Sequence, residues 1–415
     1  MEKYRISGGH PLSGEIKVAG AKNAALKIVA ASILLNGICK ISNIPEIEDI
    51  KRLAEILKSL GAKISWKNGI MEINPDAINN SNPDQELVQK LRSSIMLAGP
   101  LLARFGEVTM SHPGGCIIGK RPVDMFLSGF EAMGAEIFDH QESFTLRAKK
   151  LRGTKIILPK MSVTVTESLM MTACLAEGTT TIINAAMEPE IPSLANYLNT
   201  CGAKISGAGT SQITIEGVDK LMAKDHKLIP DRIEAGSFIM MGLATNSEIK
   251  VTDCNPNHLE TVLEILKNAG ANLEIGENHI KTKISNMRGE NLQTHEYPGF
   301  PTDLQAPFTV LMTQASGRSL IHETIFDGRL FYTDKLNTMG ADIIMCDPHR
   351  VIVSGKTKLY GKKLESPDLR AGMGLVIAGL LAEGETVIDN IYQIERGYED
   401  LVGRLKNLEA KIEKI

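Results

Sequence analysis

The octapeptide LKSLGAKI at Leu57–Ile64 decides the fold, because close copies of it return five more times along the chain. The copies are FEAMGAEI at Phe130–Ile137, LNTCGAKI at Leu198–Ile205, LKNAGANL at Leu266–Leu273, LNTMGADI at Leu336–Ile343 and LKNLEAKI at Leu405–Ile412. Their closing alanines stand at 62, 135, 203, 271, 341 and 410, so the period is 68 to 73 residues. Such a regular recurrence indicates one supersecondary unit that is used six times.

Each repeat presents its patterns in the same order. A short strand pattern comes first and is clearest at LSGEIKV (12–18) and LRGTKIIL (151–158). A helix-length run that is apolar nearly all round follows, as in AALKIVAASILL, SSIMLAGPLLA, SLMMTACLA, GSFIMMGLA, PFTVLMTQA and GMGLVIAGLLA. After a glycine turn and a strand, an amphipathic helix ends at Gly-Ala, where glycine is expected just past a helix. One or two strands close the repeat, which predicts βαβαββ six times.

The repeats predict an α/β protein of two domains with three repeats each. The three first helices of each domain would form its buried centre. Pro230 interrupts the pattern within HKLIPDRIEAG and marks the border, so the predicted domains are 22–229 and 1–21 plus 230–415. A continuous solenoid is the alternative, but solenoid repeats are typically only about 20–45 residues long.

Composition excludes several classes of protein. The charge of −3 and the single tryptophan argue against a nucleic-acid partner. No signal peptide and no apolar run of about 18 residues is evident, so we expect a cytoplasmic protein without a membrane partner. The six cysteines (39, 116, 174, 201, 254 and 346) and nine histidines lack metal-ligand spacing, so we expect reduced thiols and no metal site.

The second repeat carries an insertion. The distance from the turn glycine to the closing glycine is 24 residues in the first and third repeats and 28 in the second. The additional residues fall in SHPGGCIIGKRPVDMF (Ser111–Phe126), where Cys116 stands near Lys120 and Arg121. Cationic neighbours lower the pKa of a thiol, which could then act as an acid or a nucleophile. An incidental loop cysteine is the less favoured alternative.

Charged side chains stand where the predicted helices begin. They are Lys22, Asn23 beside it, Arg92, Glu167, Glu234, Asp303 and Arg370 at the first helices, and Arg121, Glu188, Glu190, Arg329 and Arg396 at the second helices. Helix N-termini and arginine side chains both bind anions. A solvated helix cap explains any one of them, but their recurrence at equivalent positions favours a shared anion site.

Five segments together resemble the UDP-N-acetylglucosamine 1-carboxyvinyltransferase family of enolpyruvyl transferases. They are GAKNAAL (20–26), SHPGGCIIGKRPVD (111–124), FPTDLQ (300–305), DLRAG (368–372) and ERGYE (395–399). The resemblance implies a two-domain inside-out α/β barrel of six βαβαββ repeats with the active site in the cleft between the domains. It also implies transfer of enolpyruvyl from phosphoenolpyruvate to UDP-N-acetylglucosamine at the first committed step of peptidoglycan synthesis, without metal or cofactor, and inactivation by fosfomycin.

The resemblance assigns roles to residues of this chain. Cys116 would donate a proton, Asp303 would act as the base, and Lys22 and Arg396 would complete the catalytic set. Asn23 would contact phosphoenolpyruvate with Lys22, and Arg121 and Arg396 would hold its phosphate or carboxylate. Arg92 and Arg370 would serve the sugar nucleotide and the intermediate. The nucleotide site would use Arg121, Pro122, Val123, Asp124, Met125, Lys160, Ser162, Val163 and Ile325.

Two positions depart from the family pattern. Phe126 stands where members often have histidine, and Thr164 where they commonly have glycine. A shikimate 3-phosphate enolpyruvyl transferase is the alternative enzyme, but it lacks the cysteine insertion. A non-catalytic sugar-nucleotide sensor is the alternative outside enzymes, but a sensor need not keep both an acid and a base. The sequence predicts no oligomeric state.

Overall fold

The computed structural model describes residues 2–112 and 123–415 of the chain. It is a mixed α/β structure whose described residues fall into two compact units. The first unit takes the described part of the chain from Gly20 to Ile229, and the second takes the residues up to Ala19 together with Pro230–Ile415. Cys116, Arg121 and Pro122 lie outside the described residues.

The second unit contains three four-stranded sheets. Their strand orders are β23-β24-β1-β25, β17-β18-β16-β2 and β19-β20-β22-β21. Each contains one parallel pair at one edge and two antiparallel pairs. The strands are β1 (Tyr4–Ser7), β2 (Ser13–Lys17), β16 (Glu248–Thr252), β17 (Leu273–Ile275), β18 (His279–Thr282), β19 (Leu292–Gln293), β20 (Gly317–His322), β21 (Asp342–Asp347), β22 (Arg350–Gly355), β23 (Lys363–Glu365), β24 (Glu385–Asp389) and β25 (Lys411–Lys414).

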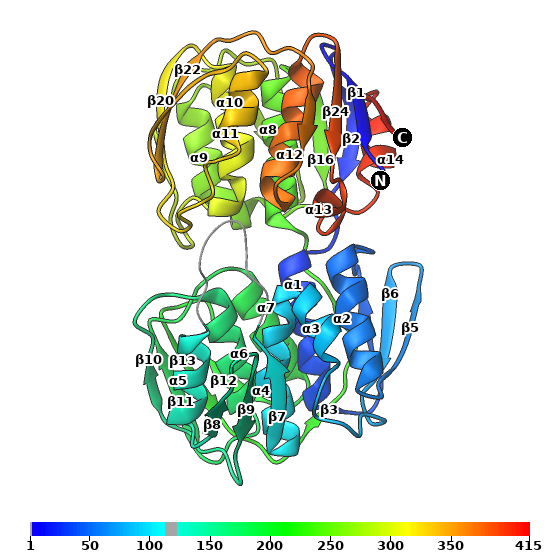
Figure 1. Ribbon diagram of the computed structural model, residues 1–415, viewed down its shortest axis with the longest axis vertical. Helices are drawn as coiled ribbons and strands as arrows, with labels where there is room; N and C mark the ends of the chain where they lie inside the picture. The colour runs from blue at the N-terminus through cyan, green and yellow to red at the C-terminus, as the bar shows by residue number, and fades with distance from the viewer. Residues whose placement is uncertain (1, 113–122) are drawn as a thin grey trace. The chain divides into compact units, whose positions relative to one another are not determined.

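Three helices form the centre of this unit. They are α8 (Arg232–Ala244), α10 (Gln305–Thr313) and α12 (Leu369–Leu381), which contact one another (Figure 1). Every residue of α8 and of α10 is buried, as the apolar runs predict. Each of the three helices contacts strands of a different sheet. Shorter helices complete the unit: η3 (Pro256–Leu259), α9 (Glu260–Asn268), η4 (Thr302–Leu304), α11 (Thr333–Thr338), α13 (Tyr392–Glu395) and α14 (Leu401–Lys406).

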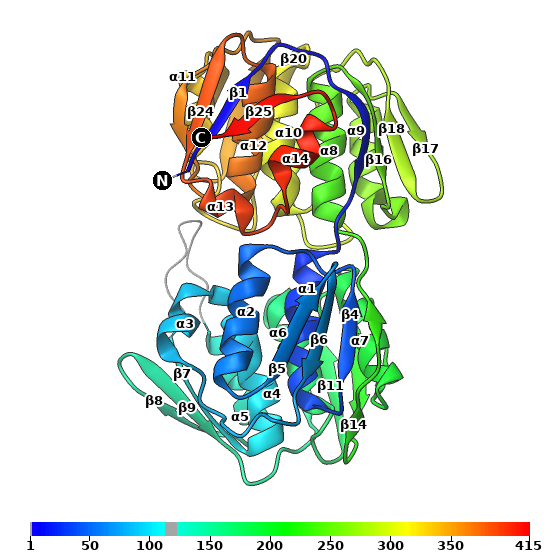
Figure 2. The same ribbon diagram turned by 90° about the vertical axis from the view of Figure 1, so that its right-hand side faces the viewer.

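In the first unit, two four-stranded sheets repeat this arrangement of one parallel and two antiparallel pairs, and two smaller sheets accompany them. Its sheets are β10-β11-β13-β12, β15-β4-β6-β5, β7-β9-β8 and β14-β3 (Figure 2). The strands are β3 (Leu35–Asn36), β4 (Cys39–Ser42), β5 (Lys63–Lys67), β6 (Ile70–Asn74), β7 (Glu107–Ser111), β8 (Glu136–Asp139), β9 (Ser143–Arg147), β10 (Lys155–Ile157), β11 (Thr179–Ile183), β12 (Lys204–Ser206), β13 (Gln212–Glu216), β14 (Leu221–Met222) and β15 (His226–Lys227). The helices are α1 (Lys22–Ala31), η1 (Ser32–Leu34), α2 (Glu48–Ser59), α3 (Gln85–Lys90), η2 (Arg92–Leu97), α4 (Ala98–Phe105), α5 (Asp124–Ala132), α6 (Val163–Ala173) and α7 (Glu190–Thr200).

The second repeat differs from the prediction in its first helix. The run SSIMLAGPLLA was expected to form one helix, but the chain forms the 3₁₀ helix η2 and then α4. Pro100 explains the boundary, because proline lacks a backbone N–H and fits only the first turn of a helix. The structure also contains α3, which the sequence did not predict.

The repeated Gly-Ala turn has one conformation at all six sites. Gly61, Gly134, Gly202, Gly270 and Gly340 have φ angles between +95° and +109°, a region open to glycine at little cost. The sixth copy has glutamate instead of glycine, and Glu409 has a φ of +64°. Glu409 therefore keeps the turn in a left-handed backbone conformation that residues with a side chain rarely adopt.

The two ends of the described chain lie on neighbouring strands. β1 pairs antiparallel with both β24 and β25, so that Tyr4 faces Ile388 on one side and Lys414 on the other. Lys3 and Ile415 also exchange two backbone hydrogen bonds, of 2.8 and 2.9 Å. No helix in the described ranges is long and apolar enough to span a membrane.

Five of the six cysteines fall on described residues. Cys39, Cys174, Cys201 and Cys254 are buried free thiols. Burial raises the pKa of Cys39 to about 11 and that of Cys174 to about 12, which makes both thiols inert at neutral pH. Cys346 is free but exposed on β21, the edge strand of its sheet.

Candidate active site

Asp303 lies in η4, directly before the buried helix α10. Its Oδ1 is 2.8 Å from Nη2 of Arg329, and its Oδ2 is 2.9 Å from Nη2 and 3.0 Å from Nε of Arg370. Both arginines are about 95% buried, whereas the Asp303 side chain is 25% exposed. Two guanidinium groups therefore hold Asp303 as a carboxylate that solvent reaches on one side.

Arg370 is fixed from two further directions. Asp368 caps α12, and its Oδ1 accepts the backbone N–H of Arg370 at 2.8 Å and that of Ala371 at 3.1 Å. The guanidinium lies 6.0 Å from the centre of the Tyr398 ring. Burial acts to lower the pKa of Arg370, but the negative charge of Asp303 acts in the opposite direction, and the net shift is upward. Arg370 is thus a permanent cation in a fixed orientation.

In the first unit, Lys22 is the first residue of α1 and Asn23 the second. Nζ of Lys22 is 2.8 Å from Oδ2 of Asp49 on α2, and both side chains are more than 90% buried. Removing one partner of such a pair leaves an uncompensated buried charge. Asp49 therefore fixes the ammonium group of Lys22 at the beginning of α1.

A second buried ion pair joins α1 to another helix, α6. Nζ of Lys27 on α1 is 3.2 Å from Oε2 of Glu167 on α6. Burial raises the pKa of Glu167 to about 8, against the attraction of Lys27, and the nearby Glu190 and Glu188 raise it further. Because Lys27 and Glu167 each lie a little more than one turn into their helices, their contact brings the first turns of α1 and α6 to the same end of the unit.

The remaining predicted nucleotide contacts also lie at helix starts. Ser162 caps α6 by accepting the N–H of Val165 at 3.5 Å, and Val163 is the first residue of that helix. Lys160 precedes them. Asp124 and Met125 begin α5, Val123 caps that helix, and Arg92 begins η2. The predicted nucleotide contacts of the first unit that the structure describes thus all lie at or just before the N-terminus of a helix.

Phe126 and Thr164, the two departures from the family pattern, lie beside these residues. Phe126 is buried in α5, with 6% of its surface exposed, and therefore belongs to the apolar core of the unit. Thr164 lies in the first turn of α6, next to Val163.

Comparisons with known proteins identify the family. The family model described as EPSP synthase (3-phosphoshikimate 1-carboxyvinyltransferase) matches residues 6–405. The protein named UDP-N-acetylglucosamine 1-carboxyvinyltransferase 1 of Carboxydothermus hydrogenoformans is 45% identical over 100% of this chain and 99% of its own. The UDP-N-acetylglucosamine 1-carboxyvinyltransferase of Desulfosudis oleivorans is 43% identical over the full length of both chains.

The chain belongs to the UDP-N-acetylglucosamine 1-carboxyvinyltransferase family. It is therefore an enzyme of the carboxyvinyl transferase class. Solved structures agree on the fold: the enolpyruvyl transferase NikO of Streptomyces tendae has a TM-score of 0.90 at 24% identity, covering 100% of this chain and 98% of its own. An EPSP synthase of Acinetobacter baumannii has a TM-score of 0.77 at 20% identity over the full length of both chains.

Of the predicted site residues in the second unit, the structure brings together Asp303 and Arg370 as neighbours. Ile325 lies on a turn whose N–H is bonded to Glu323, and Glu323 also accepts the hydroxyl of Thr302, the residue before Asp303. Arg396 directly follows α13, and its Nη1 donates to Oε1 of Gln393 at 3.0 Å. Cys116, Arg121 and Pro122 lie outside the described residues, so their predicted places in the site stay predictions.

Arg329 was predicted only as one of the charged side chains at helix starts and received no role from the resemblance, yet it contacts Asp303 as closely as Arg370 does. Lys27 and Asp49 were also missed, because no motif marks them and only the packing of α1 brings them to their partners.

At two helices of the second unit, an aspartate already accepts N–H groups that were predicted to help bind an anion. Asp231 accepts the N–H groups of Ile233 and Glu234 at the start of α8, at 2.8 and 3.0 Å. Asp368 does the same at α12. A side-chain carboxylate already satisfies these donors, and its negative charge opposes an anion there.

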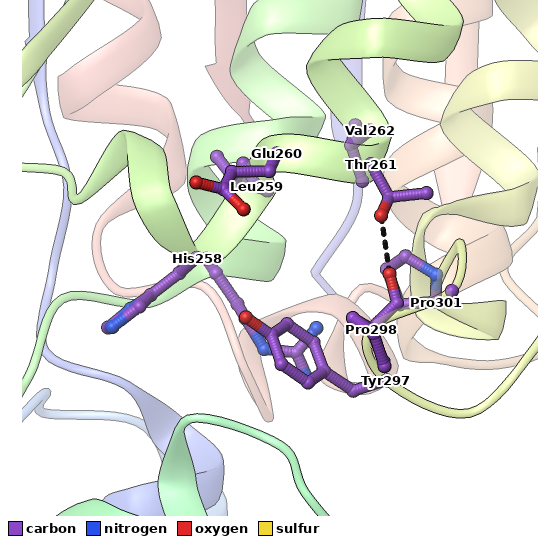
Figure 3. A pocket seen from close by; sticks show the side chains of 10 residues that line it. His258, Leu259, Glu260, Thr261, Val262, Tyr297, Pro298 and Pro301 are labelled. Carbon is purple, nitrogen blue, oxygen red and sulfur yellow. Dashed lines mark hydrogen bonds between the residues drawn. The ribbon is translucent and has the colours of Figure 1, made fainter. Parts of the chain in front are cut away.

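A small pocket lies next to the segment that leads into Asp303 (Figure 3). Pro298 and Pro301 form one side, and His258 and Thr261 form the other, with Thr261 Oγ1 donating to the carbonyl of Pro298 at 2.5 Å. The guanidinium of Arg232 lies 5.7 Å from the centre of the Tyr297 ring. These contacts anchor the segment before Asp303 to α8 and α9. Among the described residues, no group of three or more His, Cys, Asp or Glu side chains is arranged to hold a metal ion.

Proposed function

We propose that this protein transfers the enolpyruvyl group of phosphoenolpyruvate to the 3-hydroxyl of UDP-N-acetylglucosamine and releases phosphate. The observation that carries the proposal is the Asp303 carboxylate held between Arg329 and Arg370, in a chain 43–45% identical over its whole length to proteins named for this acceptor. A base that accepts a hydroxyl proton must be ionised, and two adjacent cations favour that state.

The chemistry requires an acid and a base. Protonation of the methylene carbon of phosphoenolpyruvate creates an oxocarbenium-like centre, which the sugar oxygen attacks to give a tetrahedral intermediate. Loss of phosphate from this intermediate gives the enol ether. We assign carbon protonation to Cys116 and removal of the hydroxyl proton to Asp303.

Cations must stabilise the negative charge of phosphoenolpyruvate and of the departing phosphate. We assign this role to Lys22, Arg121 and Arg396, with Asn23 as a hydrogen-bonding partner. The buried pairing of Lys22 with Asp49 supports a fixed position for its ammonium group. Arg92 and Arg370 would serve the sugar nucleotide and the intermediate, and the contact of Arg370 with Asp303 supports its place beside the reacting hydroxyl.

For the nucleotide we propose the helix starts of α5 and α6. The proposed contacts are Arg121, Pro122, Val123, Asp124, Met125, Lys160, Ser162, Val163 and, in the second unit, Ile325. Backbone groups at a helix start suit a diphosphate, and arginine binds phosphate through two N–H groups at once.

We further infer that the chain contains six copies of one βαβαββ repeat, arranged as two inside-out α/β barrels, in domains 22–229 and 1–21 plus 230–415. The strand order that recurs from sheet to sheet and the three central helices of the second unit support this interpretation. The place at the first committed step of peptidoglycan synthesis follows from the reaction. Cytoplasmic location, independence of a cofactor and inactivation by fosfomycin stay predictions.

Phosphate release with two acceptors tests the proposal. The enzyme is mixed with phosphoenolpyruvate and either UDP-N-acetylglucosamine or shikimate 3-phosphate, and we expect phosphate only with the former. The second acceptor is the alternative because the matching family model is named for it. Release with shikimate 3-phosphate alone would establish that alternative, and binding of the sugar nucleotide without any phosphate release would indicate a sensor.

A further inference from the structure

Glu323 is a fully buried carboxylate that directly follows β20. Its Oε1 accepts the backbone N–H groups of Ile325 and Phe326, at 2.8 and 3.2 Å. Its Oε2 accepts the hydroxyl of Thr302 at 2.7 Å. A buried carboxylate is costly unless it is hydrogen-bonded, and these three donors meet that requirement at both oxygens.

The hydrogen bonds of Oε2 lead to the proposed base. Thr302 donates its proton to Glu323, and its Oγ1 accepts Nη1 of Arg329 at 2.7 Å. The same guanidinium places Nη2 at 2.8 Å from Oδ1 of Asp303, the residue that follows Thr302. Glu323 therefore fixes the direction of the Thr302 hydroxyl, and Thr302 fixes the plane of the Arg329 guanidinium.

The hydrogen bonds of Oε1 lead to the proposed nucleotide contact. They shape the turn that carries Ile325 and hold the backbone of Phe326. The guanidinium of Arg329 lies 5.1 Å from the centre of the Phe326 ring, so the turn and the arginine also touch each other. The two ends of one carboxylate thus support two parts of the site.

We infer that Glu323 is a positioning residue for the transfer reaction, which orients Asp303 through Thr302 and Arg329 and shapes the turn at Ile325. This inference rests on the proposed function and adds to it a residue that touches no reacting atom. Small errors in the position of a base reduce turnover strongly, because proton transfer depends on distance and alignment.

A carboxylate accepts hydrogen bonds at both ends. In Glu323→Gln the side chain keeps one acceptor oxygen and gains two N–H donors. The oxygen should stay with the two backbone N–H groups, whose directions are fixed, while the hydroxyl of Thr302 can rotate. The amide then donates to Thr302, whose hydroxyl proton loses its acceptor and is free to rotate, so that the hydroxyl no longer fixes the plane of the Arg329 guanidinium.

We therefore expect Glu323→Gln to lower kcat by about tenfold while KM for UDP-N-acetylglucosamine stays within about twofold. Thr302→Val should do the same, and Thr302→Ser, which keeps the hydroxyl, should restore turnover. In the first two variants the acid limb of the kcat–pH profile should move to higher pH, because Arg329 no longer favours the ionised form of Asp303 as strongly.

Thr313→Val is the matched control. Its hydroxyl is also buried and donates to the carbonyl of Val310 at 2.7 Å, but within α10 and away from the network. It should change stability without changing the pH profile. Equal losses in Thr302→Val and Thr302→Ser, or an unchanged profile in Glu323→Gln, would overturn the inference. If the unsubstituted enzyme releases no phosphate with either acceptor, the proposed function fails, and the catalytic role of Glu323 fails with it.

Discussion

Asp303→Asn changes one oxygen to an amide and keeps the size of the side chain, so it tests the base directly. The amide cannot accept the hydroxyl proton, and general-base catalysis contributes at least about 10²-fold, or about 2.7 kcal/mol of activation free energy. The substitution also leaves Arg329 and Arg370 without their anion. Because both guanidinium groups are about 95% buried and Asp303 is 25% exposed, we expect the free energy of unfolding to fall by about 2–4 kcal/mol.

Two measurements separate these effects. Single-turnover phosphate release reports the chemical step, and urea unfolding reports stability at the same pH. Asp327→Asn is the control, because Asp327 is 81% exposed and pairs only loosely with His349, at 3.5 Å. Binding of UDP-N-acetylglucosamine should change little in either variant. Turnover of Asp303→Asn near that of the unsubstituted enzyme would refute the assignment, and Glu188→Gln would then be the next variant to measure.

Three further predictions follow from other parts of the chain. Fosfomycin should alkylate Cys116. Cys116→Asp should keep turnover and lose inactivation, whereas Cys116→Ser should be poor at both. Peptide mapping is best done in a Cys346→Ser background, because Cys346 is the exposed thiol of the described residues, and a label only on another cysteine would contradict the assignment of Cys116. Glu409→Gly should raise the free energy of unfolding by about 0.5–1 kcal/mol by relieving the left-handed backbone, and a loss of stability would show that the turn tolerates glutamate without strain. Lys27→Met should make the folded state bind the Glu167 proton still more tightly, so its cost in free energy of unfolding should be small below pH 8, where Glu167 is mostly protonated with or without Lys27, and should grow above pH 8 toward the about 3–5 kcal/mol of a broken buried ion pair. The double variant Lys27→Met/Glu167→Leu should recover most of that loss in urea unfolding above pH 8, and an equal loss well below and well above pH 8 would argue against a Glu167 that ionises beside Lys27.

The sequence predicted the elements better than their contacts. The Gly-Ala turns and the apolar helices could be predicted because they follow local rules of backbone conformation and periodicity. The break between η2 and α4 was also local, and Pro100 marked it. The caps at Asp231 and Asp368 follow the rule that an aspartate before an apolar run is a favourable N-cap, so they could have been predicted. The competition of such a capping carboxylate with a bound anion was not among the predictions.

The contacts that order the site were beyond the sequence. Arg329 meets Asp303 across 26 positions, and Glu167 meets Lys27 across 140. Periodicity identifies the buried face of a helix, but it does not say which residue of which neighbour lies opposite. The hydrogen bonds from Glu323 to Thr302 depend in addition on the direction of one hydroxyl group, which only the folded backbone determines.

The place of β1 between β24 and β25 has a consequence for synthesis on the ribosome. The first strand to emerge needs partners that are made last, nearly 380 residues later. At about 5–20 residues per second, β1 waits roughly 20–80 s with both edges open. The described residues of the first unit all lie between Gly20 and Ile229, so this unit can fold during that interval. Arg5, in the middle of this four-residue strand, would meanwhile discourage pairing with other nascent chains, as charged side chains do on exposed strand edges.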